Sequence, residues 1–358
     1  MHPYASLPKT AFWRTGVAET GLYGLSDLWK SPWTLPQDVQ FATYGSCFAQ
    51  HISRALKERK IGWINGEPAP LGTPETLSKA FNYGVFSART ANIYTAAQLR
   101  LLLQMAVGDV PVHEPELWEE TAGGYRDSLR PLIEPTPFRT EDDAVLSRSA
   151  MVRGLRKSVE NSDVFVFTLG LTEGWESASG QPYAACPGTI GGTFDPQTHR
   201  FVNYRGAAIR EALDDALALL KRLNPNIHLL LTVSPVPLTA TASQQHVLVA
   251  TTRSKSVLRG VAGEIAEDYA EVDYFPSYEI ITGAPTRSSF FAPNMRSVEL
   301  AGVELVMRHF FQGLDLTGPA RHGDAIAEAR QADAALAESM DAEALVCEEA
   351  ILESYNAA

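Results

Sequence analysis

Short apolar runs alternate with longer segments of helical periodicity along most of the chain. Four runs have the length and composition of buried strands, at residues 39–44, 163–169, 228–233 and 272–275. An amphipathic segment follows the first run and precedes each of the others, and we expect helices there at residues 47–60, 143–159, 207–223 and 253–269. This alternation predicts an α/β protein with a mainly parallel sheet covered by helices on both faces.

Two stretches interrupt the alternation. Residues 107–137 contain several prolines and glutamates and predict an insertion, whereas residues 178–205 are rich in Gly, Pro and Thr and predict a long loop that can include a hairpin. Long loops inside compact domains are more often functional than idle. We therefore expect three parts: an extended segment over residues 1–36 whose aromatics cover the body, one α/β/α domain over 37–318, and an acidic tail over 319–358.

Composition and charge narrow the function classes. The 358 residues are 45% hydrophobic and 20% charged, which is typical of globular proteins. The net charge of −12 disfavours nucleic acid and membrane surfaces as partners. Residues 324–358 hold nine acidic residues and one arginine, so this tail carries −8 of that charge. Its Ala, Glu and Leu content predicts a helix over residues 324–355, which would dock on the body, on a protein partner or on a second copy.

The cysteines and the first residues bear on the compartment. Cys47, Cys186 and Cys347 are widely spaced and match neither a disulfide framework nor a zinc site. The first 30 residues lack the charged and apolar regions of a secretory signal. We expect a cytoplasmic protein that uses no metal and no cofactor.

The sharpest candidate for chemistry is the segment Gly-Ser-Cys-Phe-Ala at residues 45–49, where the first strand ends and the first helix begins. Unpaired N–H groups and the helix dipole gather at such a junction. Ser46 could expose its hydroxyl there and turn its own N–H toward an oxyanion, and Gly45 allows the tight turn before it. Alternatively, Ser46 is an ordinary N-cap.

The segment at residues 45–49 resembles the signature of the GSCFA family, which is related to the SGNH (GDSL-like) hydrolases. Further blocks of that family are resembled in the same order along the chain. They lie at residues 82–87, 168–173, 234–237 and 274–279. The resemblance covers roughly residues 40–312 and implies a three-layer α/β/α, flavodoxin-like fold.

The resemblance also implies roles for particular residues. Ser46 stands at the position of the nucleophile, and Gly84 or Asn82 at that of an oxyanion donor. Thr172 replaces the asparagine of the family's Gly-x-Asn-Asp block, and a hydroxyl donates only one hydrogen bond. The Asp-x-x-His block that would supply the base is replaced by Asn294, Met295, Arg296 and Ser297. Neither Asn294 nor Ser297 takes a proton near pH 7.

Several other groups could act in the missing block's place. His246 follows the third strand in a loop expected at the ligand-binding edge of the sheet, and Glu173 is an alternative base. His51 lies on the first helix and could line the mouth of the pocket. Cys47 is a rival nucleophile at a helix N-terminus, or a buried and inert thiol, and Arg296 is a candidate anion-binding group.

Two functions remain open at this point. One is a serine esterase or O-acyltransferase in which Ser46 carries an acyl group. For this function the resemblance implies an acyl ester of a carbohydrate or polysaccharide as substrate. The other is a ligand-binding or assembly protein that keeps the fold without the chemistry, and the replaced Asp-x-x-His block supports it.

Overall fold

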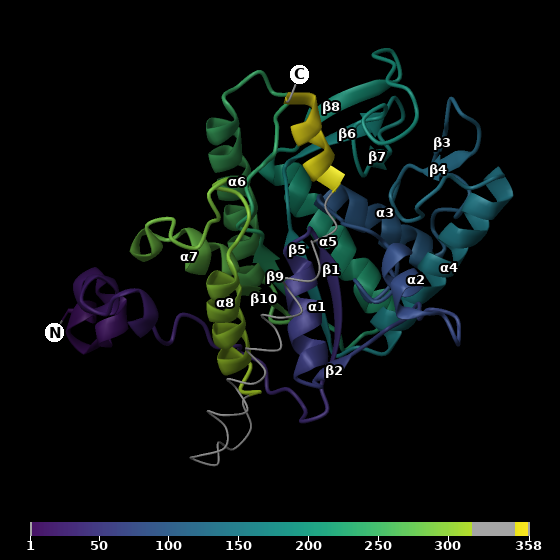
Figure 1. Ribbon diagram of the computed structural model, residues 1–358. Coiled ribbons are helices and arrows are strands. Elements are labelled where there is room, and N and C mark those ends of the chain that lie inside the picture. Colours follow the sequence, from purple (N-terminus) through teal and green to yellow (C-terminus); the bar gives the residue numbers. More distant parts are fainter. Residues whose placement is uncertain (1, 317–347, 357–358) are drawn as a thin grey trace.

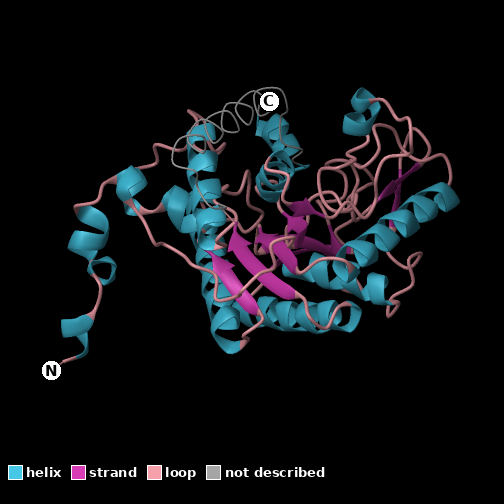
Figure 2. Ribbon diagram, turned by 90° about the horizontal axis from the view of Figure 1, so that it is seen from below, coloured by secondary structure: helices cyan, strands magenta, loops and turns pink. Residues whose placement is uncertain are grey.

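The computed structural model describes residues 2–316 and 348–356. Five parallel strands form its central sheet in the order β10-β9-β5-β1-β2, with helices on both sides (Figure 2). This is the 2-1-3-4-5 order of flavodoxin-like sheets, so the predicted α/β/α class and parallel sheet are confirmed. The strands are β1 (Gln40–Gly45), β2 (Gly62–Trp63), β5 (Val164–Leu169), β9 (His228–Val233) and β10 (Val272–Phe275).

Side chains of the central strands alternate between two apolar layers. In β5, Phe165 and Phe167 join the layer built with α3, α4, α5 and α6, whereas Val164 and Val166 join the layer built with α1, α7 and α8. Since both faces are covered, ligands have access mainly at the ends of the strands. The helices are α1 (Ala49–Glu58), α2 (Glu75–Ala80), α3 (Ala96–Val107), α4 (Glu141–Glu160), α5 (Gly206–Leu223), α6 (Val247–Asp268), α7 (Ser277–Thr282) and α8 (Leu300–Gly313).

All four helices expected beside the strands are present, as α1, α4, α5 and α6. The last of these begins earlier than expected, because His246 caps it by accepting a hydrogen bond at Nδ1 from the Leu248 N–H (3.2 Å). Helix α3 was not expected. Its first turn is fixed by a capping box in which Thr95 accepts from the Gln98 N–H and the Gln98 side chain accepts from the Thr95 N–H.

The two interrupting stretches contain small antiparallel sheets. The insertion at residues 107–137 holds the hairpin of β3 (Leu117–Glu119) and β4 (Tyr125–Asp127). The long loop at residues 178–205 holds β7 and β8, which pair with β6 just before it in a sheet of order β7-β6-β8. This sheet starts soon after β5 ends and so stands over the carboxyl edge of the main sheet. Its strands are β6 (Glu173–Ser177), β7 (Pro182–Tyr183) and β8 (His199–Asn203).

The N-terminal segment covers the body with its second half. Trp29 donates to Asp273 Oδ2 (3.0 Å), and Trp33 stacks on the His228 ring at 4.4 Å. The short helical turns within residues 3–24 project from the body in both views (Figures 1 and 2). Tyr4 and Trp13 are mostly exposed there, so these two aromatic side chains do not cover the body as expected.

The C-terminal tail is described only at its end. Most of the helix expected over residues 324–355, and Cys347, lie outside the described residues. Residues Glu348–Asn356 form a 3-10 helix, the yellow segment of Figure 1. It contacts the body through the Tyr355 hydroxyl, which donates to the Thr189 carbonyl (3.2 Å), and through Glu353 at 4.0 Å from Arg296. Within residues 2–316 and 348–356, no helix has the length and apolar content to cross a membrane.

Candidate functional site

Ser46 occupies the first position after β1, at the carboxyl edge of the sheet. Its N–H donates to the Thr168 carbonyl (3.0 Å) on neighbouring β5, and its carbonyl accepts from the Ala49 N–H (2.8 Å) at the start of α1. The N–H is therefore used by the sheet rather than turned toward an oxyanion. Ser46 is 2% exposed, and its hydroxyl has no hydrogen-bond partner among the described residues. A buried hydroxyl left in this state is costly unless a ligand completes it.

Two glycines make the space around this hydroxyl. Gly45 has a φ of 134°, and a Cβ on it would lie 2.4 Å from the Thr168 carbonyl oxygen. A Cβ on Gly170, just after β5, would lie 2.9 Å from the Ser46 Cβ and 3.2 Å from the Tyr94 ring. Any other residue at either position would push the Ser46 turn and the end of β5 apart.

A buried lysine is hydrogen-bonded to the second of these glycines. Lys255 on α6 is 1% exposed, and its Nζ donates to the Gly170 carbonyl (2.7 Å). The Gly170 N–H in turn donates to the Tyr94 carbonyl (3.1 Å). Lys255 and Tyr94 thus hold the Gly170 peptide, just after β5, from its two sides.

Residues 92–94 run beside the Ser46 turn, because the Ile93 N–H donates to the Gly45 carbonyl (2.8 Å). The side chains on either side of Ile93 both reach Glu348 of the C-terminal segment. Asn92 Nδ2 donates to Glu348 Oε2 at 2.5 Å, and the Tyr94 hydroxyl donates to the same oxygen at 2.9 Å. Gln50 on α1 donates to Asn92 Oδ1 (3.2 Å) and orients its amide. A carboxylate from the far end of the chain is thus bound by the segment that runs beside the Ser46 turn.

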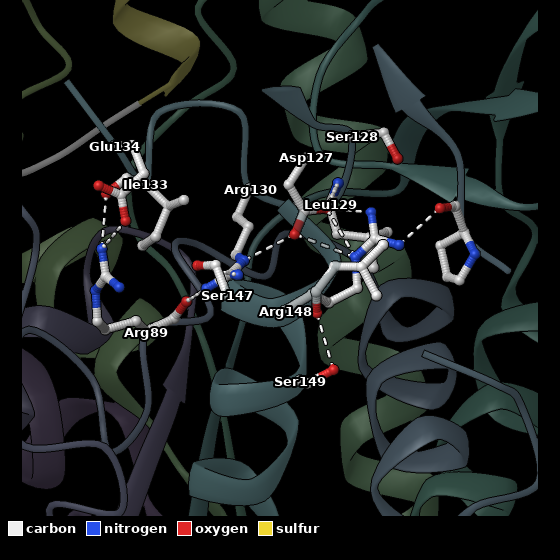
Figure 3. A network of polar contacts seen from close by, with 12 residues as sticks. Arg89, Asp127, Ser128, Leu129, Arg130, Ile133, Glu134, Ser147, Arg148 and Ser149 are labelled. Atoms are coloured by element: carbon white, nitrogen blue, oxygen red, sulfur yellow. Dashed lines mark hydrogen bonds and ion pairs between the residues drawn. The ribbon is translucent and has the colours of Figure 1, made fainter. Parts of the chain in front are cut away.

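A buried charge network fixes the segment that leads to Asn92 (Figure 3). Asp127 at the end of β4 pairs with Arg130 (2.8 Å) and Arg148 (2.6 Å), and all three side chains are fully buried. Burial opposes the charge on Asp127, but the two guanidinium groups outweigh it and lower the pKa of the carboxyl to about 2. Arg130 also donates to the Arg89 carbonyl (3.0 Å), and Arg89 pairs with Glu134 (2.7 Å). Arg89 is therefore structural.

A cavity of about 260 Å³ opens beside Tyr94. Tyr94 lines it together with Glu348 and Leu352 of the C-terminal segment, whereas Ser46 is not among its lining residues. Much of the remaining wall is apolar. It includes Leu171, Trp175, Phe201 and Leu238.

No hydrogen bond joins the Ser46 hydroxyl to any of the proposed bases. Glu173 lines the cavity, where burial raises the pKa of its carboxyl, and both its oxygens accept from Thr241 (2.8 and 2.9 Å). His246 is an exposed cap of α6. His51 is buried against Phe48, and burial, with Arg54 nearby, lowers the pKa of its imidazole to about 3, so it is neutral.

The other candidate donors make contacts of their own. The Thr172 hydroxyl donates to Asn203 Oδ1 (2.8 Å). Asn82 Nδ2 donates to the Leu132 carbonyl (3.1 Å), and the Gly84 carbonyl accepts from Lys57 (2.8 Å) near the far end of α1. None of these contacts brings Asn82 or Gly84 to Ser46. Cys47 is buried in the apolar layer of α1 and α8.

The block that replaces Asp-x-x-His forms a turn at the surface. Asn294 Nδ2 donates to the Ser297 hydroxyl (3.0 Å), and Asn294 Oδ1 accepts from the Ser297 N–H (2.9 Å). Asn294 and Ser297 are therefore hydrogen-bonded to each other. Arg296, between them, faces Glu353 and so helps to seat the segment that carries Glu348.

Four residues of this site were not singled out from the sequence: Asn92, Tyr94, Lys255 and Glu348. Lys255 left a usable signal, because it shares one helical face with the buried residues Leu258, Ala262 and Ile265. The capping box at Thr95 marks residues 92–94 as the approach to a helix. Glu348 has no such signal, since it is one of nine acidic residues in its tail.

Fold and site together define a class: a flavodoxin-like α/β/α protein with a buried serine where its first strand meets its first helix. The chain belongs to the GSCFA family, whose model matches residues 40–310. Comparison with curated proteins finds no match. The family match covers Ser46, Asn92, Tyr94 and Lys255, whereas Glu348 lies beyond it. No group of three His, Cys, Asp or Glu side chains that could hold a metal ion is found in the described chain.

Proposed function

We propose that this protein is an SGNH-like serine esterase or O-acyltransferase in which Ser46 accepts an acyl group from an ester. The observation that carries the proposal is the Ser46 hydroxyl itself, which is buried and lacks a hydrogen-bond partner in the described chain. Gly45 and Gly170 leave the space that the Ser46 turn requires. A carbohydrate or polysaccharide as the alcohol component rests on the family resemblance alone.

In the proposed reaction, Ser46 Oγ attacks the acyl carbonyl carbon, and the bond from that carbon to the alcohol oxygen breaks. The serine proton leaves with the alcohol, and water or an acceptor hydroxyl then takes the acyl group from Ser46. The developing oxyanion needs donors, and the Ser46 N–H is engaged with Thr168. Asn92 Nδ2 and the Tyr94 hydroxyl, which already bind the carboxylate oxygen of Glu348, are the proposed donors.

The reaction also needs a group that takes the proton of the Ser46 hydroxyl, and no described side chain is hydrogen-bonded to this hydroxyl. An unassisted serine hydroxyl is a poor nucleophile. Of the candidates from the sequence, we propose Glu173, because it lines the cavity and its raised pKa makes it a better base than an ordinary glutamate. His246 is the alternative, and it would have to leave its capping position. We therefore expect slow turnover of activated esters.

Turnover of p-nitrophenyl esters by the purified protein tests the proposal. Ser46→Ala should reduce the rate by at least about 100-fold, which is typical for loss of an essential group. Cys47→Ala is the matched control, since it removes the adjacent rival nucleophile, and it should retain the rate within a few-fold. Equal rates for the wild type and Ser46→Ala, or a loss confined to Cys47→Ala, would contradict the proposal.

A non-catalytic ligand-binding protein is the second candidate. It is favoured by the Asn294–Ser297 turn, in which the side chains at the Asp and His positions bond to each other at the surface. Ligand binding without any Ser46-dependent turnover would establish this function instead.

A further inference from the structure

The contact between Glu348 and the site suggests which acyl group the site takes. We propose that Asn92, Tyr94 and the adjoining cavity bind a medium-chain carboxylic acid, or the matching acyl group of an ester, and that the Glu348 carboxylate occupies the polar end of this site in its absence. This inference rests on the proposed function, because such an acid is the product of ester hydrolysis.

The polar end of this site is already shaped for a carboxylate. Asn92 Nδ2 and the Tyr94 hydroxyl converge on one oxygen of Glu348, whose side chain is almost fully buried. Two neutral donors on one carboxylate oxygen give the geometry that a product acid, or the carbonyl oxygen of an acyl group, would require. Gln50 holds the Asn92 amide from behind, so one donor is oriented before any ligand arrives.

The apolar end is the cavity. Leu171, Trp175, Phe201 and Leu238 line it, and Tyr94, Leu171 and Leu238 also belong to one small buried cluster. At about 30 Å³ for each group of water size, a volume of about 260 Å³ holds about nine non-hydrogen atoms. An acetyl group would leave most of this space empty, whereas an aliphatic chain of about eight carbons would fill it.

The C-terminal segment reproduces the polar end of such a ligand. Glu348 supplies the carboxylate, and Leu352 adds an apolar side chain to the cavity wall. Tyr355 and Glu353 hold the rest of the segment through Thr189 and Arg296, so its placement does not depend on Glu348 alone. An acid that binds to this site must displace Glu348, and the segment should therefore weaken binding of the acid.

Calorimetric titration of sodium octanoate into the full chain carrying Ser46→Ala tests the inference without any turnover. We expect octanoate to bind, and we expect its affinity to rise about tenfold or more when Glu348→Gln is added. This variant keeps the shape of the side chain but removes the charge that competes for Asn92 and Tyr94. Adding Tyr94→Phe to the variant that carries Ser46→Ala and Glu348→Gln should weaken octanoate binding about tenfold, because it removes one hydrogen bond to a charged carboxylate. Sodium acetate should bind far more weakly than octanoate in every variant.

Glu160→Gln is the matched control, since it removes a carboxylate that pairs with Arg156 on the surface of α4 and does not line the cavity. It should leave the affinity for octanoate unchanged. Absence of octanoate binding in all variants, or an affinity that neither Glu348→Gln nor Tyr94→Phe changes, would overturn the inference. If octanoate binds as expected but Ser46 supports no turnover, the proposed function fails and the acid site stands. If Ser46 supports turnover but octanoate does not bind, the acid site fails and the proposed function stands.

Discussion

At the scale of single residues, the site depends on two glycines that have no side chain to fill the space beside Ser46. Gly45 and Gly170 leave the space in which Ser46 turns from strand to helix, and Gly45 also adopts a positive φ that other residues avoid. The sequence indicated the turn at Gly45, because glycine before a strand-to-helix serine has that use. It did not indicate that Gly170 contacts Ser46, because this contact depends on the pairing of β1 with β5.

Gly45→Ala should destabilise the protein more than an equivalent change at a glycine with open surroundings. Its Cβ would approach the Thr168 carbonyl oxygen to 2.4 Å, so we expect a cost of about 3 kcal/mol or more in the free energy of unfolding. Gly84→Ala is the control, since Gly84 also has a positive φ (73°) but has no atom within 4 Å of the added Cβ, and it should cost only about 1–2 kcal/mol. Urea unfolding measures both. Equal costs would show that backbone conformation, and not the contact with β5, requires Gly45.

His51 should make stability depend on pH. Its pKa is lowered to about 3 in the folded protein by burial, so between about pH 6.5 and pH 3 the unfolded chain binds a proton that the folded protein does not. The stabilisation is complete above pH 6.5 and falls by about 1.4 kcal/mol for each pH unit below it. His51→Gln should remove this part of the slope, about 2 kcal/mol between pH 7 and pH 5, in urea unfolding at several pH values. Parallel pH profiles for the wild type and the variant would contradict the assignment.

At the scale of elements, the sequence predicted the strands and helices that repeat a simple pattern. The strands β1, β5, β9 and β10 were placed to within a residue or so, because a strand buried on both faces is a continuous apolar run. Strand β2 is only two residues long and has no such run. Helix α3 was not predicted, although the capping box formed by Thr95 and Gln98 marks its first turn in the sequence.

The Asp127 network is an element-scale device that no local pattern reveals, since Asp127, Arg130 and Arg148 look like ordinary surface charges in the sequence. Asp127→Ala would leave two buried guanidinium groups without their shared carboxylate, so we expect a loss of about 3–5 kcal/mol in the free energy of unfolding. Glu160→Ala, which breaks the exposed pair with Arg156, is the control and should cost less than about 0.5 kcal/mol. A cost for Asp127→Ala no larger than that of Glu160→Ala would show that the network contributes little to stability.

At the scale of the whole molecule, the site is assembled from distant parts of the chain. Glu348 meets Asn92 and Tyr94 across more than 250 residues of sequence. The alternation of strands and helices predicted that Ser46 would lie at the carboxyl edge, because topology alone determines it. The contact of the C-terminal tail with that edge could not be predicted, because an acidic tail can lie in solvent, pack on a second copy or enter this pocket. Only the long-range fit of Glu348 to its two donors distinguishes among them.

The most direct test of Ser46 as the nucleophile is covalent labelling by a fluorophosphonate probe, followed by peptide mass mapping. We predict one adduct, on Ser46, that is abolished in Ser46→Ala and retained in Cys47→Ala. We also predict faster labelling in Glu348→Gln, because the carboxylate held by Asn92 and Tyr94 no longer repels the probe's developing negative charge. An adduct on another residue, or no adduct on Ser46 even in Glu348→Gln, would contradict the assignment of Ser46 as the nucleophile.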